Sequence, residues 1–162
     1  IEERFDHLVR IREVQSKKPE KENGFLAFIA WPFMDTDTLL KKVKGINNNV
    51  TDDEYIRMVA ISRIMLDNIP HIKAYRMNIG DEIAELALQF GADDIDGTVQ
   101  KESIMHLAGS NAPLDHDKEK LAKIVLNSGS KPVQRNTTYT SFEEYILPKA
   151  PASRHLRMAA GD

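Results

Sequence analysis

An uninterrupted apolar run at residues 25–31, Phe-Leu-Ala-Phe-Ile-Ala-Trp, constrains the fold more than any other feature of this sequence. A half-exposed strand would alternate apolar and polar side chains, and this run does not. Strands that are apolar on both faces are typical of parallel sheets, in which helices cover the sheet. The run therefore predicts a buried strand of a parallel sheet.

Strand-like and helix-like segments alternate along the rest of the chain. Apolar spacing predicts helices over residues 2–15, 52–67, 81–90, 100–108 and 115–127. Thr51 and Glu54 have the spacing of a capping box, so the second helix should start at Asp52. Further strands are expected at residues 72–77, 95–99 and 131–140. This order predicts an α/β fold built from βα units with right-handed crossovers.

Four strands do not close a barrel, which leaves two architectures open. One is a small open sheet, and the other is the C-terminal half of a (βα) TIM-type barrel whose first half lies upstream of Ile1. The first helix opens without a capping residue, which favours the half barrel. We expect residues 1–140 to form this half barrel and residues 141–162, which show no clear period, to form a peripheral tail.

Composition excludes several classes of function. The chain has 22 basic and 25 acidic side chains and a net charge of -3, which argues against nucleic acid as a main partner. It has no apolar stretch long enough to span a membrane and no secretory signal at its start, so we expect a cytoplasmic protein without a membrane partner. It has no cysteine, which excludes a disulfide, a thiolate nucleophile and an iron-sulfur cluster ligated within these residues.

In a parallel βα architecture the binding site collects at the carboxyl ends of the strands. The densest group of polar residues near a predicted strand is Asp93, Asp94 and Asp96, followed by Thr98. These carboxylates could bind a metal, accept hydrogen bonds from substrate hydroxyls or pair with an arginine. For Asp93 and Asp94 a solvated turn is the favoured interpretation, whereas for Asp96 and Thr98 a functional and a structural role are both open.

None of the five histidines forms a recognisable metal-binding spacing, so no metal site is predicted. We expect three of them on the surface: His7, His116 and His155. His71 follows Pro70 at a strand entrance, which favours a structural role. His106 lies one turn after Glu102 on a short predicted helix, and both are candidates to face the site, His106 as a catalytic residue.

Arg135, on the last predicted strand, is the natural partner for a substrate carboxylate, because its planar fork can bind one bidentately. A structural pair with a carboxylate of the protein is the alternative. No glycine-rich phosphate loop and no Gly-x-Ser-x-Gly motif is present. The residues alone thus predict a βα half-domain with a polar rim and do not name a reaction.

Three blocks of sequence, residues 62–75, 91–99 and 104–109, resemble the C-terminal half of the aminofutalosine synthase family in order, spacing and letters. Residues 133–139 are similar to the closing strand of that family, and the resemblance extends from about Glu2 to Tyr139. Members are radical S-adenosylmethionine enzymes of the futalosine route to menaquinone.

The resemblance implies a barrel whose upstream half carries a Cys-x-x-x-Cys-x-x-Cys loop for a [4Fe-4S] cluster. It implies S-adenosylmethionine as the source of a 5′-deoxyadenosyl radical, which adds to 3-[(1-carboxyvinyl)oxy]benzoate to give aminofutalosine after rearrangement and loss of carbon dioxide. The pocket walls expected for this small-molecule substrate are Asp96, Thr98, Glu102 and Arg135, with His106. Alone, the chain should be inactive and should self-associate through its open sheet edges.

Some residues depart from the family pattern and keep alternatives open. Ala30 stands where the family usually has proline, and Trp31 looks more like the sister cyclase that acts on dehypoxanthine futalosine. Residues 93–98 and His106 look like the synthase, whereas Arg76 stands where a tryptophan is common. A non-catalytic binding or assembly module is a further alternative.

Overall fold

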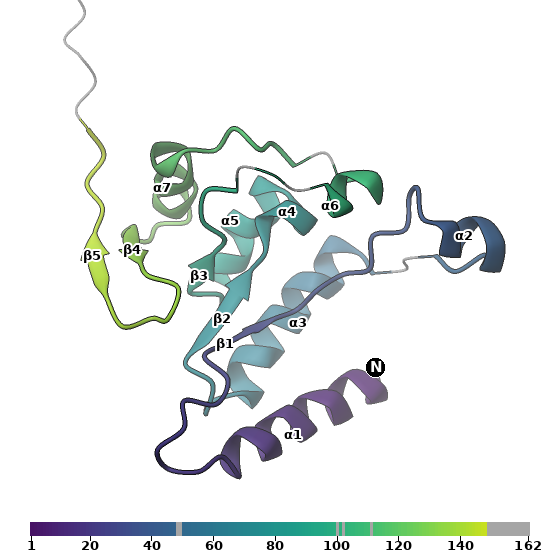
Figure 1. Cartoon of the computed structure of the whole chain (residues 1–162), viewed down its shortest axis with the longest axis horizontal. Helices are drawn as coiled ribbons and strands as arrows, with labels where there is room; N and C mark the ends of the chain where they lie inside the picture. Colours follow the sequence, from purple (N-terminus) through teal and green to yellow (C-terminus); the bar gives the residue numbers. More distant parts are fainter. Residues whose placement is uncertain (48–49, 100, 102, 111, 149–162) are drawn as a thin grey trace, which may run out of the picture.

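A computed structural model describes residues 1–47, 50–99, 101, 103–110 and 112–148 of the chain (Figure 1). The elements in chain order are α1 (Glu2–Ser16), β1 (Ala27–Ile29), α2 (Leu39–Lys44), α3 (Asp52–Met65), β2 (His71–Ala74), α4 (Arg76–Ile79), α5 (Asp81–Gln89), β3 (Asp94–Ile95), α6 (Ile104–Leu107), α7 (Lys118–Asn127), β4 (Val133–Arg135) and β5 (Phe142–Glu144). The α/β class and the alternation of helices and strands are confirmed.

The centre of the fold is a parallel sheet with the strand order β1-β2-β3. On β2, Lys73 is in register with Ile29 of β1 on one side and with Asp94 of β3 on the other. The predicted parallel strand at residues 25–31 is therefore confirmed, but burial on both of its faces is wrong. Its three β1 residues are half-buried, and Trp31 is 61% exposed.

Helices cover one face of this sheet, and the hydrophobic core lies between them and the strands. Figure 1 shows α3 and α5 behind the strands, with α1 beside α3. Ile72 and Ala74 of β2 are completely buried in this core. Their neighbours His71 and Lys73 are half-buried, and strand geometry places them on the opposite face. We call this opposite face the polar face of the sheet.

Helix caps explain which predicted boundaries are correct. The Thr51 hydroxyl accepts a hydrogen bond from the Glu54 backbone N–H at 3.3 Å, so α3 starts at Asp52 as predicted. The last long helix starts at Lys118, not at 115, because the Asp117 side chain caps it. The sequence pattern did not predict α2, which Thr38 caps in the same way.

The predicted strands 72–77 and 95–99 are shorter in the structure. Strand β2 ends at Ala74, and the chain then turns into α4 because the Arg76 N–H donates to Asp96 and not to a neighbouring strand. Strand β3 consists of Asp94 and Ile95 only. The predicted helix 100–108 is reduced to α6, although residues 100 and 102 lie outside the described part of the chain.

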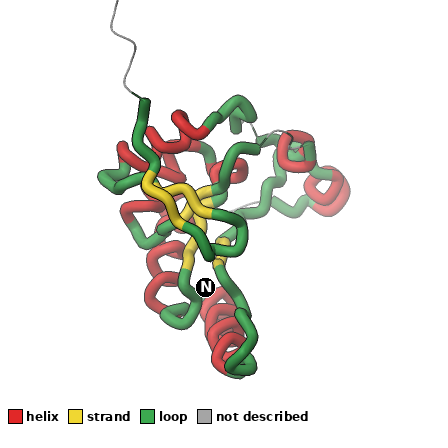
Figure 2. The backbone as a smooth tube through the Cα atoms, turned by 60° about the vertical axis from the view of Figure 1, so that its left-hand side comes forward, coloured by secondary structure: helices red, strands yellow, loops and turns green. Residues whose placement is uncertain are grey.

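The fourth parallel strand predicted at residues 131–140 is wrong. Strand β4 pairs antiparallel with β5, with Arg135 opposite Phe142, and the two form a separate hairpin. In Figure 2 this hairpin lies in front of the parallel strands. Within the described residues, the parallel sheet has three strands, and none of the helices is both long and apolar enough to cross a membrane.

Candidate functional site

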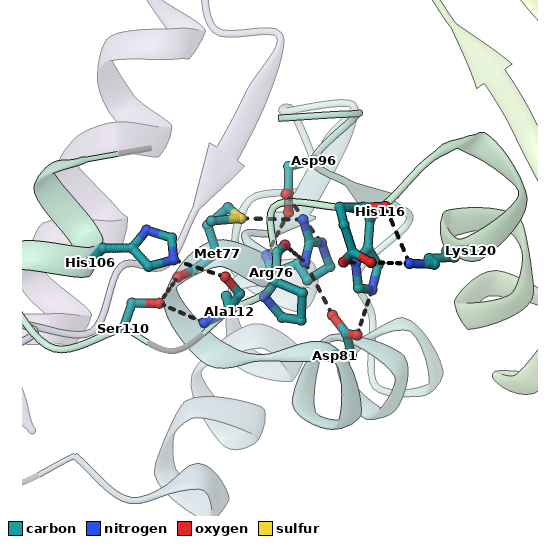
Figure 3. A network of polar contacts seen from close by, with 11 residues as sticks. Arg76, Met77, Asp81, Asp96, His106, Ser110, Ala112, His116 and Lys120 are labelled. Atoms are coloured by element: carbon teal, nitrogen blue, oxygen red, sulfur yellow. Dashed lines mark hydrogen bonds and ion pairs between the residues drawn. The ribbon is translucent and has the colours of Figure 1, made fainter. Parts of the chain in front are cut away.

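A buried arginine and a buried aspartate meet at the carboxyl end of the parallel sheet. The backbone N–H of Arg76 donates to Oδ1 of Asp96 at 2.6 Å, and the Arg76 Nε lies 3.5 Å from Oδ2 of Asp96 (Figure 3). The side chains of Arg76 and Asp96 are 0% and 4% exposed. Neither Nε nor Oδ2 forms a hydrogen bond within the described residues. This pair is the most deeply buried charged contact at the carboxyl end of the sheet.

The guanidinium of Arg76 connects two neighbouring segments. Its Nη1 donates to Oδ1 of Asp81 at 3.3 Å and to the carbonyl of Pro113 at 3.0 Å. Burial raises the pKa of Asp96, and the charge of Arg76 lowers it by less, so the net shift is upward. Asp96 therefore binds a proton more readily than an ordinary aspartate does.

The network continues toward the surface through His116. The Nε2 of His116 contacts Oδ2 of Asp81 at 2.7 Å, and its side chain is only 9% exposed. The prediction of a surface position for His116 is therefore wrong, because Asp81 at the start of α5 holds the ring inside. Asp115 then forms an ion pair with Lys120.

His106 lies at the other end of the network drawn in Figure 3. Its Nε2 contacts the carbonyl of Ala112 at 3.0 Å. The Ser110 hydroxyl accepts a hydrogen bond from the Ala112 N–H and donates to the carbonyl of Met77 at 2.7 Å. The route from His106 to Asp96 thus runs through several intervening residues. The structure does not bring these two predicted site residues into direct contact.

Three predicted site residues line one hollow of about 510 Å³ between β3, α7 and β4. They are the buried Asp96, the exposed Thr98 and the partly exposed Arg135. Apolar side chains such as Leu121 and Val125 form its α7 wall. Glu102, the remaining candidate, lies outside the described residues. The structure thus groups Asp96, Thr98 and Arg135 and places His106 apart from them.

Arg135 is bound to a carboxylate of the protein itself. It donates to both oxygens of Asp94, and its guanidinium lies 4.0 Å from the ring centre of Tyr139. The Tyr139 hydroxyl donates to the same carboxylate at 2.6 Å. The hydrogen bond to Asp94 raises the pKa of Arg135, and burial followed by the same carboxylate raises the pKa of Tyr139.

Asp93 contacts an arginine and a histidine. Its two oxygens contact Arg63 Nη2 at 2.5 Å and His71 Nδ1 at 2.8 Å. The ring of His71 stacks on Tyr139, with 4.2 Å between the ring centres. The interpretation as a solvated turn is therefore wrong for Asp94, which lies on β3 and is 10% exposed, whereas Asp93 is exposed as expected but is held by these contacts. The structural role predicted for His71 is consistent with these contacts.

Sequence reasoning missed Lys73, on the polar face of the sheet. Residues 72–77 were interpreted as a short mixed strand, so the alternation within them was not used. The alternation of His71 and Lys73 with the apolar Ile72 and Ala74 is the signal that could have found it. An aromatic pair, Trp31 and Tyr75, also lies at the carboxyl end, with ring centres 5.2 Å apart.

Comparison with known proteins assigns this fold to a family. Residues 22–147 match the family model described as the CofH/MqnC C-terminal region. The chain belongs to this family. An aminodeoxyfutalosine synthase of Thermus thermophilus is 37% identical over 139 residues, which are 86% of this chain and 36% of that protein. The CofH/MqnC C-terminal region is thus present here as a unit that spans little more than a third of this longer relative.

Other relatives that share the CofH/MqnC C-terminal region carry different names. A cyclic dehypoxanthine futalosine synthase of Halalkalibacterium halodurans is 34% identical, over 86% of this chain and 35% of that protein. A 5-amino-6-(D-ribitylamino)uracil–L-tyrosine 4-hydroxyphenyl transferase of Methanoculleus marisnigri is also 34% identical, over 85% of this chain and 36% of that protein. The region is therefore common to relatives named for different reactions.

The residues of this chain do not fit an iron-sulfur cluster as ligands, because the sequence contains no cysteine. Among the described residues, no group of three histidine, aspartate or glutamate side chains is placed to hold a metal ion.

Proposed function

We propose that this chain is the C-terminal, substrate-binding part of a radical S-adenosylmethionine enzyme of menaquinone biosynthesis, an aminodeoxyfutalosine synthase. The observation that carries the proposal is the 37% identity to the Thermus thermophilus enzyme of that name. The substrate would be 3-[(1-carboxyvinyl)oxy]benzoate, converted to aminofutalosine. A [4Fe-4S] cluster and S-adenosylmethionine, bound elsewhere in the longer protein, supply the 5′-deoxyadenosyl radical.

In this proposal the parallel sheet is part of the wall of a TIM-type barrel, with its polar face toward the interior. The carboxyl end of such a barrel is where substrates bind. The buried network of Arg76 and Asp96 lies at that end. Asp96, Thr98 and Arg135, which line one hollow, would form part of the pocket wall. Glu102 and His106 are the remaining candidates, and His106 would orient the reacting centre.

A second candidate is the cyclic dehypoxanthine futalosine synthase. The 34% identity to the Halalkalibacterium halodurans protein supports it, and the resemblance of Trp31 to the cyclase family, noted from the sequence, agrees with it. Residues 93–98 and His106 resemble the synthase instead. The two reactions differ in substrate, so one assay with both substrates separates them.

The test begins with the gene that encodes this chain. The proposal requires a Cys-x-x-x-Cys-x-x-Cys loop upstream of Ile1, and a gene without it would leave the binding or assembly module as the explanation. The protein is then loaded with its cluster anaerobically and given S-adenosylmethionine with each substrate in turn. Consumption of the carboxyvinyl ether is expected. Turnover of dehypoxanthine futalosine alone would assign the second candidate, and turnover of neither would overturn both.

The isolated chain provides a control for this experiment. Without cysteine it should show no iron-sulfur absorption after reconstitution and should not cleave S-adenosylmethionine. In a half barrel, β1 and β3 would leave sheet edges open, and such edges pair with other chains. Self-association at tens of micromolar, measured by light scattering, is therefore expected, and a strictly monomeric species would contradict the half barrel.

A further inference from the structure

The polar face of the sheet carries a lysine, Lys73, that forms no ion pair with any of the residues that the structure describes. Lys73 lies in the middle of β2, the central strand, and is half-buried. Among the described residues, no carboxylate forms an ion pair or a hydrogen bond with its ammonium group. A half-buried cation without a partner is unfavourable, because burial removes water from the charge.

The two carboxylates nearest to Lys73 along β3 are already paired with arginines. Asp94, in register with Lys73, accepts two hydrogen bonds from Arg135 and one from Tyr139. Asp96 lies against the guanidinium and the backbone N–H of Arg76. Lys73 is close enough to Asp96 for its charge to act on that carboxyl group, but the two form no ion pair. Each of these two carboxylates therefore lies against an arginine, and Lys73 forms an ion pair with neither of them.

Aromatic pairs lie at both ends of β2, the strand that carries Lys73. The stacked pair of His71 and Tyr139 covers the polar face at the start of β2. At the other end, Trp31 and Tyr75 form the aromatic pair that follows β1 and β2. Lys73 thus lies on β2 between His71, which stacks on Tyr139, and Tyr75, which is half-buried and pairs with the exposed Trp31. A cation near aromatic rings suits an anionic ligand with an apolar ring.

We propose that Lys73 binds a carboxylate of the substrate. The inference rests on the proposed function, since 3-[(1-carboxyvinyl)oxy]benzoate carries one carboxylate on its ring and one on its vinyl group. Arg135 was the cation expected for this role, but it donates two hydrogen bonds to Asp94. Lys73 could bind the substrate carboxylate without disrupting the pair of Arg135 with Asp94 or that of Arg76 with Asp96.

The experiment compares Lys73→Met with Lys123→Met in the full-length, cluster-loaded protein. Lys123 is exposed on α7 and lacks an ion pair among the described residues, so its variant controls for the loss of one positive charge. The ligands are the carboxyvinyl ether, 3-(vinyloxy)benzoate and 2-phenoxyacrylate. Each of the two analogues lacks one carboxylate. Affinities are measured by calorimetry, and kcat and KM are measured for the ether.

For Lys73→Met we expect a Kd for the ether that is roughly 10- to 100-fold higher, with kcat changed much less than KM. The variant should also bind one of the two analogues as tightly as the wild type does, because that analogue already lacks the carboxylate that Lys73 contacts. Lys73→Arg should keep most of the affinity. If methionine disturbs folding, as judged by the urea midpoint, Lys73→Gln replaces it with the same expected result.

Two outcomes would overturn the role of Lys73 while the proposed function stands. One is an unchanged Kd for the ether in Lys73→Met. The other is an equal loss for the ether and for both analogues, which would mean a general distortion of the site. By contrast, a wild-type protein that neither binds nor converts the ether would overturn the proposed function itself.

Discussion

Arg135 donates two hydrogen bonds to the carboxylate of Asp94, from Nε at 2.8 Å and from Nη2 at 2.6 Å. This bidentate pair joins the β4–β5 hairpin to the edge of the parallel sheet, although the two sheets share no backbone pairing among the described residues. The side chains of Arg135 and Asp94 are 19% and 10% exposed, so the pair is largely shielded from water. The two sheets are thus held together at this point by a side-chain ion pair and not by backbone hydrogen bonds between strands.

Replacing Arg135 with alanine should therefore lower stability first. The change leaves the Asp94 carboxylate with fewer donors in a shielded position, and we expect a loss of about 2 kcal/mol in the free energy of unfolding. Arg135→Lys, which keeps the charge but not the fork, should recover only part of it. Urea denaturation measures both. An unchanged urea midpoint together with weaker substrate binding would instead support the role expected from the sequence, in which Arg135 binds a substrate carboxylate.

Replacing Arg76 should destabilise the protein more than replacing Arg135 does. Arg76→Met keeps the length of the side chain but leaves Asp96 buried without its cation, which should cost about 3 to 5 kcal/mol. The matched control is Arg57→Met on α3, where an exposed pair with Asp53 is lost. That control should change stability by less than about 0.5 kcal/mol. Similar urea midpoints for the two variants would contradict this account of the buried network.

Stability should fall on the alkaline side, in part because of Tyr55. Burial raises the pKa of Tyr55 above its ordinary value, so the folded protein keeps this proton after the unfolded chain has released it near pH 10. The stabilising contribution is therefore complete below about pH 10 and is lost as pH rises through the folded-state pKa. Unfolding free energies measured between pH 8 and 11 should decline toward the alkaline end.

Tyr55→Phe should make this decline less steep. The hydroxyl forms no hydrogen bond within the described residues, so its removal should leave stability at pH 7 unchanged or raise it by up to about 1 kcal/mol. Tyr139→Phe serves as the comparison, because that hydroxyl donates to Asp94 and its loss should destabilise the protein at pH 7. A lower urea midpoint for Tyr55→Phe at pH 7 would reveal a partner for the Tyr55 hydroxyl.

Gly91 should not tolerate a side chain. Its φ is +118°, and a Cβ at this position would lie 2.9 Å from Cβ of Arg63. Gly91→Ala should therefore lower the melting temperature, with a cost of about 1 to 3 kcal/mol. Gly97 lies six positions later, and an added Cβ there meets no atom within 4 Å. Gly97→Ala should accordingly melt within a degree or two of the wild type.

The sequence predicts local features of this fold better than features that depend on distant partners. The start of α3 was correct because its cap, Thr51, lies beside it in the chain. The fourth parallel strand was wrong because apolar pattern alone does not tell a strand of the main sheet from one of a separate hairpin. The partner of β4 is β5, in a stretch without clear periodicity.

In the candidate site, too, features set by neighbouring residues were predicted better than features set by distant partners. Asp96 was singled out from its place after a strand, and it is buried beside Arg76. His116 was expected on the surface, because its partner Asp81 lies 35 residues away and no local pattern joins them. The pairing of Asp94 with Arg135 spans 41 residues in the same way. Charge pairs of this kind depend on tertiary structure. The polarity of one residue and of its sequence neighbours therefore does not predict them.

The strict alternation in β2 has a consequence for how this gene can change. Ile72 and Ala74 serve the core, whereas His71 and Lys73 serve the polar face, so the two sets are interleaved in four consecutive codons. An in-frame deletion of one codon here would turn every following strand residue to the other side. Lineages that carry this region should therefore accumulate substitutions within 71–74 but place length changes elsewhere.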